Sequence, residues 1–183
     1  EKLASEGLVG LHPFDSDGQL AGVGTVGLEI LEDVPQMTDV FISIGGGGLI
    51  GGTAVAMKAK KPDIRLWGVE TEKANAMQAA LDAGEVVNVK PTSLAKTLGA
   101  PFVSVDALAL MQEYMEDLII VSDEDAIVAQ RVLLEDMKLF TELAASCVLS
   151  AVGQIQDKFT SDSHVVLLIC GGNEDPVDMV NRW

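Results

Sequence analysis

Four consecutive glycines, Gly45, Gly46, Gly47 and Gly48, separate an apolar run at residues 39–44 from a segment of helical composition at residues 49–60. Glycine allows the backbone to approach a ligand closely. A helix that begins at such a loop offers unpaired N–H groups and the positive end of its dipole. A tight strand-to-helix turn without a ligand is the alternative. The length of the run, which Gly51 and Gly52 extend, favours a site for a phosphate or another anion.

The spacing of the glycines does not by itself identify the ligand. No Lys followed by Ser or Thr comes after the glycines, so the loop is not of the Walker type. Gly46, Gly48 and Gly51 satisfy the pattern G-x-G-x-x-G after a predicted strand. Glu70 ends the next predicted strand about 20 residues later, where a dinucleotide site places its ribose-binding acid. An NAD-binding module is therefore one hypothesis.

Short apolar runs bounded by turn residues alternate with helical periodicity along the 183 residues. This pattern predicts a single α/β domain over residues 1–183, with a mostly parallel sheet between helices in three layers. Strands are expected at residues 39–44, 64–70, 117–121 and 164–169, and helices at residues 24–32, 49–60, 74–83, 106–114, 124–138, 142–158 and 176–182. Ser122 followed by Asp125 resembles a capping box. Residues 83–102 form a long irregular connection.

The amino-acid composition excludes several kinds of binding partner. The formal net charge of -16 argues against nucleic acid, because phosphates would be repelled. No apolar stretch reaches the ~20 residues of a membrane span. Cys147 and Cys170 lie far apart, and neither they nor His12 and His164 form a metal-binding pattern. We therefore expect a reduced, cytoplasmic protein with no bound metal.

Six fragments occur in one order and span nearly the whole chain. They are "LHPFD", "AGVGTVGLEILE", "IGGGGLIGG", "GVET", "TELAAS" and "LLICGGNED". Together they resemble the C-terminal part of the serine/threonine dehydratases, pyridoxal-phosphate (PLP) enzymes of the tryptophan-synthase-β fold type. The resemblance implies the large-domain fold of that family, PLP as cofactor and a lyase reaction on serine or threonine.

The resemblance also assigns residues. The backbone amides of Gly45, Gly46, Gly47 and Gly48 would hold the cofactor phosphate, with Leu49 opening the helix. Cys170, which precedes "GGN", would hydrogen-bond the pyridine nitrogen; a small buried apolar residue is the alternative. Glu142 matches the acid of the family segment "EPAGA", with Leu143 in place of Pro, and would line the pocket. Its alternative is a first-turn acid favoured by the helix dipole.

Three positions depart from the family pattern. Glu70 matches the first ligand of the family's cation site, but the second acid is replaced by Ala76, so no metal is assigned. Val23 stands where "GQGT" has Gln, and Lys96 stands where an acid is usual.

The catalytic lysine of the family, in a Ser-x-Lys-x-Arg setting, and its "SxGNH" carboxylate-binding loop have no counterpart in the sequence. The lysines are Lys2, Lys58, Lys60, Lys61, Lys73, Lys90, Lys96, Lys138 and Lys158, and Lys96 is the one conceivable substitute. We therefore expect a truncated dehydratase that is inactive alone, with no catalytic residue of its own. It would dimerise through surface that the missing segment covers in relatives, or be completed by another chain. A non-catalytic remnant that binds a phosphate ligand or oligomerises is the alternative.

Overall fold

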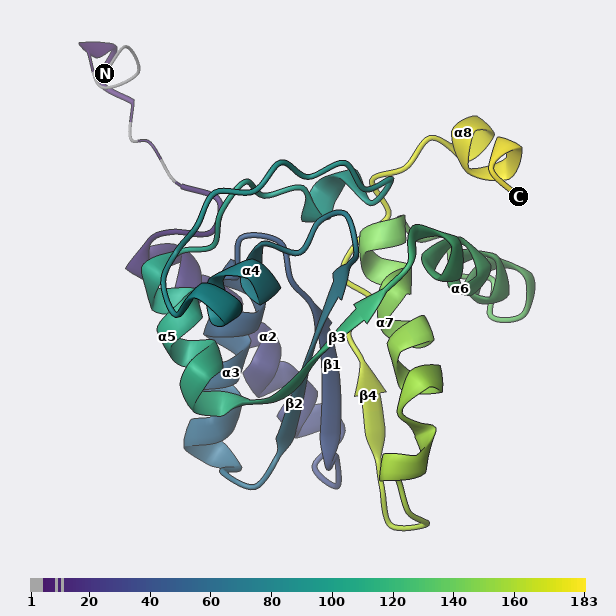
Figure 1. Cartoon of the computed structure of the whole chain (residues 1–183). Helices are drawn as coiled ribbons and strands as arrows, with labels where there is room; N and C mark the ends of the chain where they lie inside the picture. The colour runs from purple at the N-terminus through teal and green to yellow at the C-terminus, as the bar shows by residue number, and fades with distance from the viewer. Residues whose placement is uncertain (1–4, 9, 11) are drawn as a thin grey trace.

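Four parallel strands form the central sheet of the computed structural model, which describes residues 5–8, 10 and 12–183 (Figure 1). The strands are β1 (Asp39–Ser43), β2 (Arg65–Thr71), β3 (Met115–Val121) and β4 (Val165–Leu167), in the order β3-β2-β1-β4. The helices are α2 (Asp17–Asp33), α3 (Gly48–Lys60), α4 (Ala76–Ala83), α5 (Val105–Tyr114), α6 (Asp123–Glu135), α7 (Leu143–Gln154) and α8 (Pro176–Asn181), with short 3₁₀ turns η1 (Lys96–Leu98) and η2 (Gln156–Lys158).

The two faces of the sheet bury separate cores. Along β1, Val40 and Ile42 pack with α3, α4 and α5 on one face, whereas Phe41 packs with α6 and α7 on the other. This alternation follows from the two-residue period of a strand. The predicted three-layer α/β fold with a parallel sheet is confirmed. Within the described residues, no helix combines the length and apolar character needed to cross a membrane.

Element boundaries differ from the expectations for local reasons. Helix α2 begins at Asp17 rather than at residue 24, because the Ser16 side chain accepts a hydrogen bond from the Gln19 N–H and caps it. The predicted cap of α6 is confirmed, since Ser122 accepts from the Asp125 N–H at 2.9 Å. Strand β4 is shorter than expected because only residues 165–167 pair with β1.

Glycines bring α2 and α3 into close contact. A Cβ atom added at Gly52 would lie 2.3 Å from the carbonyl oxygen of Leu20, and one at Gly27 would lie 3.0 Å from that of Thr53. The obstacle is backbone in both cases, so neither helix can yield by rotating a side chain. Helix α3 carries the glycine loop at its N-terminus, so the packing of α2 on α3 fixes the position of the loop.

Gly52→Ala is therefore expected to lower the free energy of unfolding by roughly 1–3 kcal/mol, the usual cost of overpacking. The matched control is Gly22→Ala, on α2, where an added Cβ meets nothing within 4 Å. That change should stabilise the protein by up to about 1 kcal/mol through helix propensity. Urea denaturation followed by circular dichroism measures both. Equal effects of the two substitutions would contradict the packing argument.

Candidate functional site

The carboxyl ends of β1 and β4 open onto one cavity of about 240 Å³. Its lining residues are Pro13, Phe14, Ser43, Gly45, Gly46, Gly47, Gly48, Leu49, Thr97, Leu98, Glu142, Ala144 and Cys170. All seven residues assigned to a cofactor from the sequence are in this set. Residues almost 130 positions apart meet here because β1 and β4 are parallel neighbours.

The glycine loop ends at an uncapped helix. Gly47 is the N-cap residue of α3 and has φ +92, a left-handed conformation that favours glycine. No side chain caps α3, and its first turn carries no acid. The first backbone N–H groups of a helix have no partner within the helix. This end of α3 therefore presents donors and a positive dipole end to the cavity.

The glycines are also required by their neighbours. A Cβ at Gly46 would lie 2.2 Å from the ring of Phe14, and one at Gly47 would lie 2.4 Å from the Cβ of Ala107. At Gly48 it would lie 2.7 Å from the side-chain oxygen of Gln19. Close packing against neighbouring segments is therefore one reason for the run of glycines.

Glu142 directs its carboxylate into the cavity rather than onto its own helix. It is the N-cap residue of α7, but its side chain does not cap the helix. One carboxylate oxygen accepts a hydrogen bond from the Thr97 hydroxyl at 2.8 Å. A Cβ atom added at Gly171 would lie 2.3 Å from the other carboxylate oxygen. The helix-dipole alternative therefore does not account for the orientation of this side chain.

Cys170 lies beside Ser43, with its sulfur 3.5 Å from the Ser43 hydroxyl oxygen. The residue as a whole is exposed at the cavity, so it is not the buried apolar residue of the alternative interpretation. Surrounding protein nevertheless desolvates the sulfur and raises the pKa of the thiol, although the hydrogen bond with Ser43 opposes the shift. At neutral pH the side chain is a neutral thiol.

Several lining residues were not predicted from the sequence. Phe14 and Pro13 belong to the quoted fragment "LHPFD", so a signal for them was present. Thr97 and Leu98 lie in the irregular connection, where no periodicity distinguishes one residue from the next. Their place in the cavity depends on how the connection folds back over the sheet.

No lysine of the described part of the chain lines this cavity. Lys96 lines a neighbouring cavity of about 90 Å³, which shares Thr97, Glu142 and Ala144 with the first. It is exposed, on the η1 turn. Lys96 is therefore close to the candidate site but outside it.

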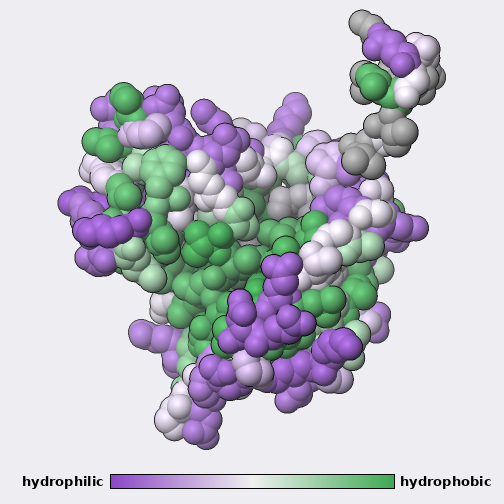
Figure 2. All heavy atoms as spheres, turned by 180° about the vertical axis from the view of Figure 1, so that it is seen from behind, coloured by the Kyte–Doolittle hydropathy of each residue, from purple (hydrophilic) through white to green (hydrophobic). Residues whose placement is uncertain are grey.

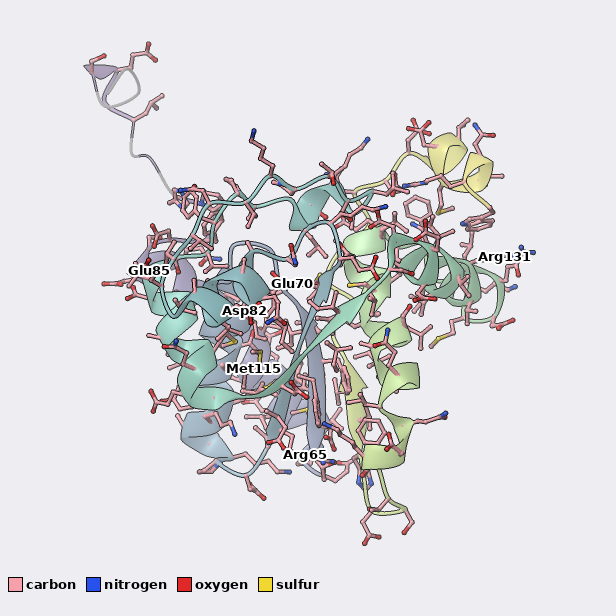
Figure 3. The ribbon with its side chains drawn as sticks, in the orientation of Figure 1. Arg65, Glu70, Asp82, Glu85, Met115 and Arg131 are labelled. Carbon is pink, nitrogen blue, oxygen red and sulfur yellow. The ribbon has the colours of Figure 1, made fainter. Side chains whose placement is uncertain are left out.

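Glu70 is fully buried at the end of β2, beside the start of α4 (Figure 3). Its two carboxylate oxygens accept hydrogen bonds from the backbone N–H groups of Met77 at 2.8 Å and Gln78 at 2.9 Å. Burial raises the pKa of Glu70 to about 7, although these two hydrogen bonds act to lower it. Because Glu70 is fully buried, with both oxygens turned to the N-terminus of α4, it does not present its carboxylate to the ribose of a dinucleotide.

The resemblance predicts no metal at Glu70, because Ala76 stands where the family pattern has its second acid. Among the residues the structure describes, no group of three or more His, Cys, Asp or Glu is arranged to hold a metal ion. The N-terminal turn of α4 contacts the Glu70 carboxylate directly.

The model of the family described as "Pyridoxal-phosphate dependent enzyme" matches residues 1–171. The chain belongs to this family. The resemblance to serine/threonine dehydratases is confirmed at the level of individual relatives. The L-threonine ammonia-lyase of Thermotoga maritima is 37% identical over 178 residues, which are 96% of this chain and 43% of that protein.

The catabolic L-threonine dehydratase TdcB of Staphylococcus aureus is 32% identical over 179 residues, which are 96% of this chain and 52% of that protein. Among solved structures, maize serine racemase superposes with a TM-score of 0.89 at 29% identity, covering 98% of this chain and 58% of that one. The chain thus spans about half the length of the curated relatives it matches. The family membership and the engaged Glu70 leave the NAD hypothesis without support.

The raised pKa of Glu70 predicts a measurable effect of pH on stability. The folded state holds the proton up to about pH 7, whereas the unfolded chain releases it near 4.5. Stability from this group is therefore complete below pH 4.5 and is lost as the pH rises through about 7. Relative to Glu70→Gln, the wild-type protein should lose of order 3 kcal/mol of unfolding free energy between pH 5 and pH 8. Urea denaturation of both proteins between pH 5 and pH 8 tests this prediction. If the difference between their unfolding free energies does not change with pH, the raised pKa of Glu70 is refuted.

Proposed function

We propose that this chain forms the phosphate-binding and ring-binding half of the PLP site of a serine or threonine ammonia-lyase. The observation that carries the proposal is the meeting of the glycine loop, Glu142 and Cys170 around one cavity. The names of the relatives, an L-threonine ammonia-lyase and an L-threonine dehydratase, support the substrate class. The two free cysteines, one of them exposed, agree with a reducing compartment and hence with a cytoplasmic protein.

Each group in the cavity has a role in this proposal. The amides from Gly45 to Leu49 bind the phosphate, and the dipole of α3 stabilises its charge. The neutral Cys170 thiol would be the hydrogen-bond partner of the pyridine nitrogen and would leave that nitrogen unprotonated. PLP, when bound, supplies an electron sink for the charge that develops at the α-carbon of an amino acid. Phe14 and Leu98 add apolar surface to the lining of the cavity.

The loop assignment is tested by titrating PLP and, separately, inorganic phosphate into the purified chain. Gly46→Asp should abolish saturable binding of both, because it adds a like charge and a side chain where the Phe14 ring lies 2.2 Å away. Gly153→Asp, which adds the same charge at an exposed position with nothing within 4 Å, should bind as the wild type does. Equal affinities of the two variants would overturn the assignment.

The remainder of the site is proposed to come from protein beyond these 183 residues. On the side of β4 away from β1, the described residues supply no further strand. Val166 and Leu168 pack on the core beside α3 yet stay partly exposed. Figure 2 shows hydrophobic residues gathered across the middle of the face opposite to that of Figure 1. Such edges and patches favour association, so we propose that a complementing segment covers them, or a second copy when that segment is absent.

The isolated chain should therefore yield no 2-oxobutyrate from threonine above the background of free PLP, because no lysine of the described residues lines the cavity to move the α-proton. Light scattering should show a dimer. Adding a chain that carries a family lysine and carboxylate-binding loop should restore elimination, and changing the added lysine to alanine should remove it. Turnover by the isolated chain that Lys96→Ala abolishes would refute the proposal.

A further inference from the structure

A buried carboxylate outside the cavity holds the segment that enters it. Asp123, the first residue of α6, is 3% exposed. One of its oxygens accepts a hydrogen bond from the Ser93 hydroxyl, and the other accepts from the Leu94 N–H at 3.1 Å. The Lys73 ammonium lies 3.8 Å from an Asp123 oxygen, on a side chain that is half-exposed. The carboxylate thus satisfies its hydrogen bonds mainly on the irregular connection.

Ser93 links this carboxylate to the end of β2. Its hydroxyl oxygen accepts from the Thr71 hydroxyl at 2.8 Å and from the Ala95 N–H at 3.0 Å. The carbonyl of Lys73 accepts from the N–H groups of Thr92 at 2.7 Å and Ser93 at 3.2 Å. The connection is therefore attached at one point to both β2 and α6.

The attached segment leads directly into the cavity. Ala95 and Leu98 are buried in the core beside α7, so η1 has little freedom once Ser93 is fixed. Thr97 then donates its hydroxyl hydrogen to the Glu142 carboxylate at 2.8 Å. Its carbonyl oxygen lies 3.3 Å from the position of a Cβ on Gly45, the first residue of the glycine loop.

We propose that Ser93 and Asp123 are positioning residues of the PLP site: they fix residues 93–98, and through Thr97 they hold Glu142 in the cavity. This inference rests on the proposed function. Neither residue lines the cavity, so their effect on a ligand passes through Thr97 and the loop. The buried Asp123 carboxylate uses its lone pairs to hold a segment that has no strand or long helix of its own.

The test uses the 183-residue chain with Ser93→Ala, Asp123→Ala, Ser93→Thr and Glu124→Ala. Ser93→Ala should weaken PLP binding about tenfold, the effect of one lost hydrogen bond to a charged group. It should also speed amide hydrogen exchange in residues 93–99. Ser93→Thr keeps the hydroxyl and should restore both values. Glu124→Ala, which removes an exposed acid from the same helix turn, should change neither.

A double-mutant cycle distinguishes positioning from general destabilisation. If Ser93 acts through Thr97, Ser93→Ala combined with Thr97→Val should weaken PLP binding no more than the stronger single variant. Additive losses, or faster exchange with unchanged PLP affinity, would refute the inference while leaving the proposed function intact. A wild-type chain that shows no saturable PLP binding would refute the proposed function, and the inference with it. Asp123→Ala gives an independent check, with the same expected loss as Ser93→Ala.

Discussion

Parallel pairing of the strands is the constraint on which the site depends. Because β2, β1 and β4 run in the same direction, their carboxyl ends meet at one edge of the sheet. The glycine loop follows β1, Glu70 lies at the end of β2, and Cys170 comes after β4. Antiparallel pairing of any one strand would place its terminal residues at the opposite edge. The hydrogen bonds of the sheet therefore determine which residues meet at the cavity. Contacts among the surrounding side chains then determine how those residues are oriented.

The glycine loop combines two properties. It leads into a helix whose N-terminus no side chain caps, and its Cα positions admit Phe14, Ala107 and Gln19 from neighbouring segments. A ligand-free tight turn would need the positive φ of Gly47 but not three more glycines in contact with other elements. The packing requirement extends to Gly52, which lets α2 approach the same helix. Glycine thus allows neighbouring segments to approach the loop closely, and it also allows α2 to pack directly on α3.

The sequence predicted the order and type of the strands and helices, because apolar periodicity reports burial directly. It also placed the glycines, Glu142 and Cys170 in one site through the fragments shared with the family. The sequence did not predict Thr97 or the Ser93–Asp123 pair. Their contacts join residues of the irregular connection to helix starts about 30 to 45 positions away, and no period relates the two. The predicted start of α2 was wrong because the side chain of Ser16 caps the helix and so determines its boundary.

Glu70 is a fully buried acid at the end of β2. A buried carboxylate is costly unless other groups compensate for its lost hydration. Two backbone N–H groups at the start of α4 supply that compensation. They are neutral donors, so they hold the carboxylate less firmly than a cation would, and burial still raises the pKa of Glu70 to about 7. Burial disfavours the charged carboxylate by more than these two hydrogen bonds favour it, so the folded state is more stable when Glu70 is protonated. The stability of the fold therefore depends on pH at the edge of the sheet where the cavity lies.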